Sequence, residues 1–342
     1  MPINVWGEMK QKICLKIFFI SLTLILILTN IVEAVPPTLN LTTTKTSYSL
    51  GEKITLTGNL TVDGTPATDA LVTIQILNPR GETIALRSVT TGTNPPSHIF
   101  MEILEFYPCD SAGNPTYSFK RGGDAGFKIR VRNNAASTYT IIIPIYIQYS
   151  NDMPFKIFNI YTGTIGPNQE LAVSTWPIPI PSDAPLGTTK AYANVIGNYP
   201  KDGGRAYALE KSTTFQITAT TTSLSSQDFT TQTTGEGTFN LTFTTNPYGG
   251  MLGNYTAHAT SFYYPYLLTA QTIFPVILKG DITGPYGVPD GKVDIKDVAK
   301  VSKAFGQSPP SDPKCDLNKD GKVDIKDVAI VSLDFGKWGT LP

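Results

Sequence analysis

The residues with the clearest chemical pattern in this 342-residue chain are two groups of aspartates near the C-terminus. Residues 290–306 read DGKVDIKDVAKVSKAFG and residues 320–336 read DGKVDIKDVAIVSLDFG, so the two segments differ at only three positions. Such close self-similarity indicates a duplicated structural unit. Carboxylate oxygens are ligands that Ca²⁺ prefers, so each unit could hold a calcium ion.

The second unit has the residue spacing of an EF-hand loop. Oxygen ligands are expected at loop positions one, three, five, seven, nine and twelve, which correspond to Asp316, Asn318, Asp320, the carbonyl of Lys322, Asp324 and Asp327. Position nine usually acts through a water molecule, and Gly321 at position six permits the sharp turn of the loop. Position twelve is aspartate instead of the usual glutamate. We expect one calcium ion in this loop.

The first unit begins differently. Asp281 precedes Asp290 by nine residues, whereas the corresponding aspartates of the second unit are four residues apart, and residues 283–289 fill the difference. A backbone carbonyl near Val288 is expected to replace the missing side chain at position three. We therefore expect a second calcium ion, bound by Asp281, Asp290, the carbonyl of Lys292, Asp294 and Asp297.

A helix is expected after each loop. Apolar and small residues recur there at helical spacing, and Gly306 and Gly336 are helix-ending signals. The recurring residues are Ile295, Val298, Ala299, Ser302 and Phe305 in the first unit and Ile325, Val328, Ala329, Ser332 and Phe335 in the second.

Two nearly identical loop-helix units, each with aspartate at position twelve, resemble a type I dockerin. The resemblance covers Asp281 to about Trp338 and implies a module at residues 279–342 that binds two calcium ions and a cohesin-like partner protein. The alternative is that calcium only holds the fold of the module together.

The differences between the units predict a recognition surface. Lys300 and Lys303 of the first unit are replaced by Ile330 and Leu333 in the second, and residues three apart lie on one helical face. The second helix therefore carries an apolar strip that either the neighbouring β domain or a separate protein must cover. We expect the β domain to cover it, because the connection at residues 278–280 is short.

Most of the remaining chain predicts β-strands. Apolar residues alternate with polar ones at Ile54 and Leu56 and again at Val72, Ile74 and Ile76, which is typical of half-buried strands. These segments, together with residues 237–257, resemble the opening and closing halves of a macroglobulin-type or bacterial Ig-like domain.

The middle segment shows the same alternation at Phe127, Ile129 and Val131. A strand is expected at residues 140–149, where Pro144 predicts an edge or a bulge because proline cannot donate to the sheet ladder. Residues 176–195 resemble the later strands of an adhesion-type Ig-like fold.

The predicted fold class is thus mainly β, with Ig-like β-sandwich domains followed by a small α-helical dockerin-like module with two EF-hand-like loops. We expect a discontinuous macroglobulin or Ig-like sandwich at 35–97 and 219–278, with a second Ig-like sandwich inserted at 98–218. Insertion is tolerated where the ends of a domain lie close together. The alternative is three tandem domains.

Residues 1–34 predict an export signal. Three lysines, at 10, 12 and 16, precede an apolar run at 17–29, and small residues follow at 32–34. The run is shorter than a membrane span needs, so we expect cleavage instead of an uncleaved anchor and a secreted or cell-surface protein. Glycosylation sequons fit this location and stand at Asn40, Asn59, Asn240 and Asn254. Whether Cys109 and Cys315 form a disulfide stays open at this stage.

The composition argues against a nucleic-acid partner, because 27 basic residues are matched by 27 acidic ones. Catalytic motifs are not found, and we expect no enzyme activity. His98 and His258 stand far apart, each in a strand-like pattern. Surface positions are expected for the carboxylates that could otherwise form a glycosidase pair: Glu102, Glu105, Glu170 and Glu210.

Aromatic residues could stack on sugars, but we expect Trp176 and the Tyr263–Tyr266 segment to be buried in a core or an interface. The sequence therefore predicts a secreted, non-catalytic calcium-binding protein whose dockerin-like module mediates attachment or assembly at the cell surface. The alternative is a carbohydrate-binding accessory component of a polysaccharide-degrading system, or an unrecognised glycoside hydrolase.

Overall fold

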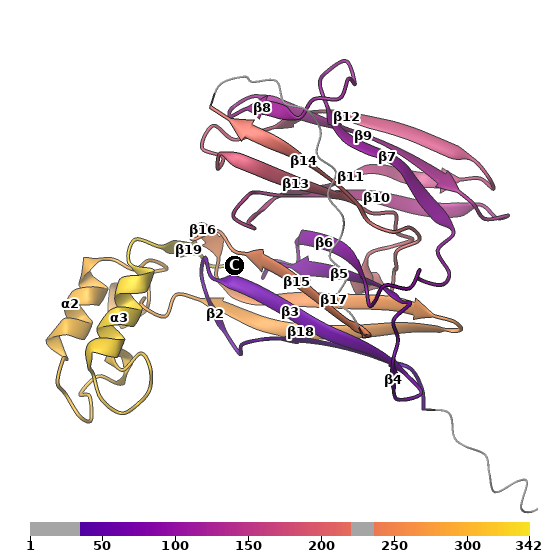
Figure 1. Cartoon of the computed structure of the whole chain (residues 1–342). Coiled ribbons are helices and arrows are strands. Elements are labelled where there is room, and N and C mark those ends of the chain that lie inside the picture. The colour runs from indigo at the N-terminus through magenta and orange to yellow at the C-terminus, as the bar shows by residue number, and fades with distance from the viewer. Residues whose placement is uncertain (1–34, 220–235) are drawn as a thin grey trace, which may run out of the picture. The chain divides into compact units, whose positions relative to one another are not determined.

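The computed structural model describes residues 35–219 and 236–342. The predicted export signal lies outside these residues. The described chain is mainly β, with two short helices near the C-terminus (Figure 1). None of its helices has both the length and the apolar composition needed to cross a bilayer.

Strands from both ends of the β region build two shared sheets. One has the order β1-β3-β15, with β4 also paired to β3, and the other has the order β2-β18-β17-β5-β6. The strands are β1 (Thr38–Thr43), β2 (Tyr48–Ser49), β3 (Lys53–Val62), β4 (Thr65–Pro66), β5 (Leu71–Leu77), β6 (Thr83–Thr90), β15 (Thr238–Thr244), β17 (Gly253–Tyr263) and β18 (Tyr266–Ile277). Between β15 and β17 in the sequence stands β16 (Tyr248–Met251), which belongs to a separate two-stranded sheet. Residues that precede and follow the middle segment are therefore hydrogen-bonded neighbours.

The alternating residues of these strands form one core. Ile54 and Leu56 of β3 are fully buried, as the period of two predicts. On β15, Phe239, Leu241 and Phe243 are buried in the same core while the residues between them face outward. The sheet pairing thus encloses apolar residues that stand far apart in the sequence.

Strand β5 corrects the prediction of half-buried strands. All seven of its residues are buried, including Thr73 and Gln75. A loop of the middle segment, which includes η1 (Pro200–Asp202), supplies the polar partners of the second face. The Ala206 N–H donates to Thr73 Oγ1 at 3.0 Å, and the Lys201 N–H donates to Gln75 Oε1 at 2.9 Å.

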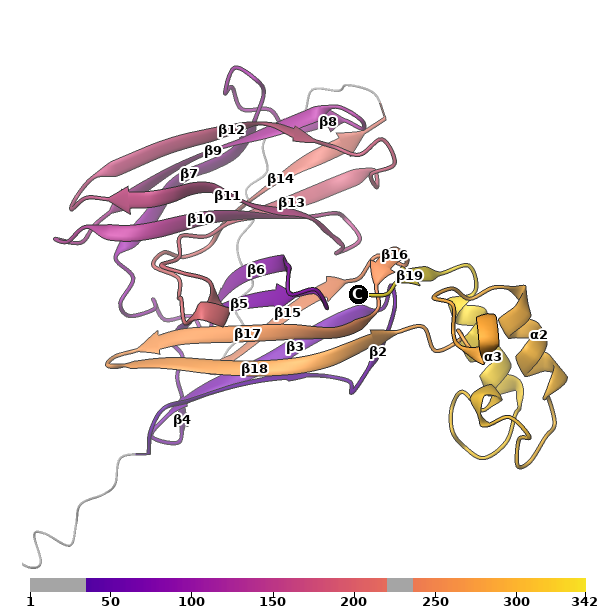
Figure 2. The same cartoon turned by 180° about the vertical axis from the view of Figure 1, so that it is seen from behind.

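The middle segment forms two further sheets around a separate core (Figure 2). Their orders are β11-β10-β13-β14-β8 and β12-β9-β7. The strands are β7 (Met101–Cys109), β8 (Ser118–Lys120), β9 (Asp124–Asn133), β10 (Tyr139–Gln148), β11 (Pro154–Ile165), β12 (Glu170–Pro179), β13 (Gly187–Ala193) and β14 (Lys211–Thr218). Strand β10 lies between two neighbours, so Pro144 is not on an edge; the register shifts beside it instead, as a bulge requires.

A buried ion pair joins the flanking and middle segments. Arg87 of β6 contacts Glu210 at 2.8 Å, and its guanidinium carbon lies 3.4 Å from the ring centre of Tyr192. The Asn194 amide also donates to Glu210 at 3.0 Å. The side chain of Glu210 is only 1% exposed. The predicted surface position of Glu210 is therefore wrong, because its cationic partner lies on a strand distant in sequence.

The C-terminal residues contain two loop-helix units that pair with each other. They include η2 (Pro285–Gly287), α2 (Ile295–Lys303), η3 (Pro313–Cys315), α3 (Ile325–Asp334) and β19 (Trp338–Thr340). The Gly306 N–H donates to the Val323 carbonyl at 2.8 Å, and the Gly336 N–H donates to the Val293 carbonyl at 2.9 Å. Each loop is thus bonded to the end of the other unit's helix.

Replacing Glu210 with glutamine is expected to lower the free energy of unfolding by about 3 kcal/mol, because Arg87 would remain buried without a counterion. Equilibrium unfolding in urea measures this change. The matched control is Glu170→Gln, which breaks two exposed ion pairs, with Arg130 and Arg132, and is expected to cost less than about 1 kcal/mol. Equal costs for the two variants would contradict this account of the junction.

Candidate metal centre

The second loop is organised by two aspartates. Asp316 accepts hydrogen bonds from the N–H groups of Asp320 at 3.1 Å and Gly321 at 2.8 Å. Asp327 accepts from the Leu317 N–H at 2.7 Å and, through its other oxygen, from the Asp324 N–H at 2.8 Å. Gly321 has a φ of 88°, a conformation that glycine adopts without strain. These bonds fold the loop around its own carboxylates.

The first loop has the same hydrogen bonds despite its longer opening. Asp281 accepts from the N–H groups of Asp290 at 3.2 Å and Gly291 at 2.8 Å. Asp297 accepts from the Ile282 N–H at 2.9 Å and from the Asp294 N–H at 2.8 Å. Residues 283–289 are therefore an insertion that leaves Asp281 equivalent to position one of the other loop.

The carboxylate at position twelve is deeply buried in both loops. Asp297 is 1% exposed and Asp327 is fully buried. Asp281 is also buried, and this burial raises its pKa to about 6. Within the described residues, no lysine or arginine pairs with Asp281, Asp297, Asp316 or Asp327. Buried anions without a cation are costly, so the donor chemistry of the loops fits a bound cation.

The outer aspartates face lysines instead. Lys322 lies 3.1 Å from Asp324, and Lys326 lies 3.6 Å from Asp320. In the described ranges 35–219 and 236–342, three or more His, Cys, Asp or Glu side chains do not converge on one point. A calcium ion in either loop would thus draw on other oxygens as well, namely the Asn318 amide and the carbonyls of residues 288, 292 and 322.

Both helices begin at an aspartate that the sequence predicts as a calcium ligand. Asp294 and Asp324 are the N-caps of α2 and α3, and each accepts a hydrogen bond from the backbone N–H two residues later. The position-twelve aspartates complete a capping box with these residues. Loop geometry and helix start are therefore set by the same four side chains, so a change in one alters the other.

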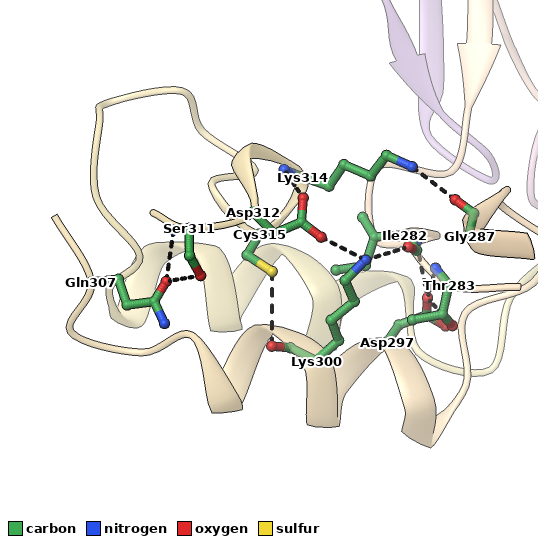
Figure 3. A network of polar contacts seen from close by, with 10 residues as sticks. All are labelled: Ile282, Thr283, Gly287, Asp297, Lys300, Gln307, Ser311, Asp312, Lys314 and Cys315. Carbon is green, nitrogen blue, oxygen red and sulfur yellow. Dashed lines mark hydrogen bonds and ion pairs between the residues drawn. The ribbon is translucent and has the colours of Figure 1, made fainter. Parts of the chain in front are cut away.

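Lys300 makes polar contacts with two other segments of the C-terminal residues (Figure 3). Its ammonium group lies 2.9 Å from Asp312 and donates to the Ile282 carbonyl at 3.2 Å. The hydrogen bond from Lys300 to the Asp312 carboxylate lowers the pKa of Asp312. Cys315 lies beside the same lysine, with its sulfur 3.8 Å from the Lys300 carbonyl. Lys300 thus connects the first helix to the first loop and to the segment that precedes the second loop.

The prediction that the β domain covers Leu333 is wrong, because this side chain is 76% exposed. The neighbouring difference, Asp334 in place of Ala304, is buried instead and contacts the start and the end of the same module. Asp334 is 2% exposed, accepts from the Gly280 N–H at 3.2 Å and pairs with Lys337 at 2.8 Å. The sequence analysis did not predict this contact. The signal that could have indicated it is the replacement of Ala304 in the first unit by the charged Asp334 in the second.

Strand β19 connects the first loop to the β region. The Gly339 N–H donates to the Gly291 carbonyl at 2.7 Å, while the Leu252 N–H donates to the Thr340 carbonyl at 2.8 Å. Strand β19 also pairs with β16 in parallel. A Cβ added at Gly249 would meet the ring of Trp338 at 2.7 Å, so only glycine allows this close approach.

Three of the four glutamates that could form a glycosidase pair, Glu105, Glu170 and Glu210, are engaged with arginines. Arg130 of β9 pairs with Glu105 of β7 and with Glu170 of β12 on a shared sheet face, the latter at 2.9 Å. Hydrogen bonds from Arg132 and Arg130 lower the pKa of Glu170. Glu102 is exposed on the same three-stranded sheet.

The cysteines form no disulfide within the described residues, and only one of the two histidines lies in a strand. Cys109 and Cys315 are both buried and unpaired. His258 lies in β17, but His98 lies in a turn, so its predicted strand is wrong. With a φ of 63°, His98 has a conformation that does not continue a strand.

Aromatic residues are more exposed than predicted. Trp176 is 40% exposed, and in the β17–β18 hairpin Tyr264 is 69% and Tyr266 is 51% exposed. Tyr264 stacks on His98 with ring centres 5.4 Å apart. The expected burial of Trp176, Tyr264 and Tyr266 is therefore wrong, because they lie on outer sheet surfaces or at a hairpin end.

No protein-family model matches the chain, and no curated protein matches it. Solved structures give weak partial likenesses. The Pseudomonas fluorescens alkylpurine DNA glycosylase AlkC has 12% identity and a TM-score of 0.28, with 38% of this chain and 32% of that chain covered. The C-terminal domain of Wzt has 11% identity and a TM-score of 0.30, with 40% and 84% covered.

A third likeness is to Bacteroides uniformis β-glucuronidase 2, with 12% identity and a TM-score of 0.27, covering 51% of this chain and 27% of that chain. The chain thus spans about a third or less of the length of the two enzymes. TM-scores this low support no conclusion about fold or function.

Replacing Asp334 with alanine is expected to loosen the connection at Gly280, because the Gly280 N–H and the Lys337 ammonium both lose their acceptor. The loss of a charged hydrogen bond, about 1.5 kcal/mol, should raise trypsin cleavage after Lys279 about tenfold. The exposed Leu333 provides the control, since Leu333→Ala should leave the cleavage rate unchanged. The account is refuted if both variants are cleaved at the wild-type rate.

Proposed function

We propose that this chain is an exported, non-catalytic protein whose C-terminal residues 279–342 form a dockerin-like module that binds two calcium ions through EF-hand-like loops and mediates attachment or assembly at the cell surface. The observation that supports this proposal most is that two loops of different length make the same six hydrogen bonds from backbone N–H groups to aspartate carboxylates. The acceptors are Asp316, Asp324 and Asp327 in the second loop and Asp281, Asp294 and Asp297 in the first.

Calcium would complete the charge balance of each loop. Four carboxylates gather in each unit, and their mutual repulsion disfavours the compact loop until a cation is present. With a dissociation constant of about 1 μM and about 1 mM external calcium, binding would stabilise each site by about 4 kcal/mol. A module that depends on calcium in this way would be folded outside the cell, where calcium is abundant.

The β region would serve as the carrier of this module. We infer two Ig-like β-sandwiches, one discontinuous at 35–97 and 219–278 and the other inserted at 98–218. The shared sheets of β3 with β15 and β5 with β17 support this organisation, as does the separate core of the middle segment.

A cohesin-like protein is the partner that this proposal favours. Apolar side chains on both helices are exposed: Ile295 is 66%, Ile325 is 67% and Leu333 is 76% exposed. Exposed apolar residues gathered on one small module are typical of a protein interface. The exposure of Leu333 argues against cover by the β region and so favours a separate protein.

A second candidate is a carbohydrate-binding accessory function in a polysaccharide-degrading system. It is favoured by one observation, the exposed rings of Tyr264 and Tyr266 at the end of the β17–β18 hairpin. Exposed aromatic rings supply apolar surface on which a sugar can stack. Arg205, whose guanidinium carbon lies 3.9 Å from the ring centre of Phe262, would add a hydrogen-bond donor nearby.

Calcium is expected to slow amide hydrogen exchange in residues 281–303 and 316–334 of the full-length protein, and EDTA is expected to reverse the effect. Asp327→Ala should weaken calcium binding at the second site by at least about tenfold, because it removes ligand oxygens, whereas Lys326→Ala should not weaken it, because it removes a competing cation beside Asp320 and no ligand oxygen. Calorimetric titration separates the two variants. Identical titrations, or exchange that calcium does not change, would sink the calcium assignment.

Attachment is tested by fractionating cells that produce the full-length chain. With calcium, the protein should remain with the cell envelope, and chelator should release it into the medium. Asp327→Ala should be released even with calcium, whereas Lys326→Ala should behave as wild type. If neither chelator nor Asp327→Ala changes the amount of protein released, the module does not mediate attachment.

The second candidate predicts that the protein is retarded in gels containing a polysaccharide that it binds, and that Tyr264→Ala abolishes the retardation. Trp176→Ala provides a control on a different sheet, and it should have no effect. Unretarded migration of wild-type protein through plant, bacterial and fungal polysaccharides would argue against a carbohydrate ligand.

A further inference from the structure

Three Asn-Leu-Thr sequences lie side by side in one sheet. They begin at Asn40 in β1, Asn59 in β3 and Asn240 in β15. Asn40 stands opposite Asn59, and Asn59 stands opposite Thr238. The leucine of each sequence is buried in the core, so the period of two turns the asparagine and the threonine outward together. The fold thus gathers three glycosylation sequons on one face.

This face is almost free of charge. Its outward residues, apart from the asparagines and Lys53, are Thr38, Thr42, Thr55, Thr57, Thr61, Thr238, Thr242 and Thr244. Lys53 lies at one end and pairs with Asp152 at 3.2 Å. Soluble domains normally carry about 25–35% charged residues on their surface, which keeps them apart in solution. On this face, a feature other than charge is needed to keep the molecules apart in solution.

The two outer strands of the sheet are the parts most open to association with another molecule. In the described sheet, β1 and β15 each pair with β3 alone, so each has an edge; on β15 the last residue of this edge is covered, because the Thr244 N–H donates to the Asp152 carbonyl at 3.0 Å. Edge strands are commonly protected by charged residues or proline, because an unprotected edge can pair with another molecule. Neither Thr38–Thr43 nor Thr238–Thr244 contains a charged residue or a proline. Each, however, contains one exposed sequon asparagine.

We propose that Asn40 and Asn240 carry N-linked oligosaccharides, which shield the two uncharged edge strands from association. This inference rests on the proposed export of the protein. Both asparagines are exposed, whereas Asn59 is half-buried on the central strand. Asn40 Nδ2 donates to Asn59 Oδ1 at 3.3 Å, and a substituted amide still has one N–H for this bond.

The modification requires a lipid-linked oligosaccharide donor and a separate membrane-bound transferase. The asparagine Nδ2 forms a bond to C1 of the first sugar. The bond between C1 and the phosphate oxygen of the donor breaks, and the lipid phosphate or diphosphate leaves with the electron pair. One amide proton is lost to a base, so the side chain stays uncharged. The sequon threonine, at 42 or 242, lies on the same face as its asparagine.

Mass spectrometry of peptides from the full-length protein, purified from the organism that encodes it, tests the modification. Oligosaccharide is expected on both Asn40 and Asn240. The double variant N40Q/N240Q should lose both mass increments, and its main peak in size-exclusion chromatography should shift from monomer to larger species. N254Q removes the sequon in β17, on the other sheet, and should stay monomeric.

A further double variant separates shielding from misfolding. N40D/N240D also lacks sugar but places one charge on each edge strand, so it should remain monomeric. Aggregation of N40D/N240D, or a monomeric N40Q/N240Q, would overturn the shielding role. Unmodified Asn40 and Asn240 in exported protein would overturn the inference alone, whereas unmodified protein retained in the cytoplasm would overturn the proposed export as well.

Discussion

The pairing of β3 with β15 is the constraint on which the rest of the structure depends. It joins residues that lie on either side of the middle segment, and closing so long a loop costs conformational entropy. Burial of apolar side chains such as Leu56 and Phe239 between the two sheets offsets this cost. The closure also holds β17 and β18 in register, and β18 leads directly into the first loop.

The C-terminal residues solve a similar problem at a smaller scale. Each helix has only nine or ten residues, too few to be stable alone in water. Val293 and Val323 are 1% exposed because each loop packs and bonds across to the other unit. The buried carboxylates of Asp297 and Asp327 then accept hydrogen bonds from both their loops and the starts of their helices.

Polar residues mark the places where these parts meet. Arg87 with Glu210 joins the flanking and middle segments, and Asp334 holds Gly280, three residues after the end of β18, at the end of the second helix. A buried ion pair adds little net stability but is costly to break, so it favours one arrangement of the parts over others. Two exposed surfaces lie away from these contacts: the uncharged face of the sheet of β1, β3 and β15, and the end of the β17–β18 hairpin with Tyr264 and Tyr266.

The sequence by itself determined the mainly β character and the two C-terminal helices, because alternation at Ile54 or helical spacing after Asp324 is a local property that neighbouring residues impose. The spacing of the aspartates in the loops is local in the same sense. Only the tertiary structure decided that Gln75 is buried, that Glu210 is paired and that Leu333 is exposed. These outcomes depend on which distant segment covers a side chain, and residues far apart in the sequence carry no local signal of that contact.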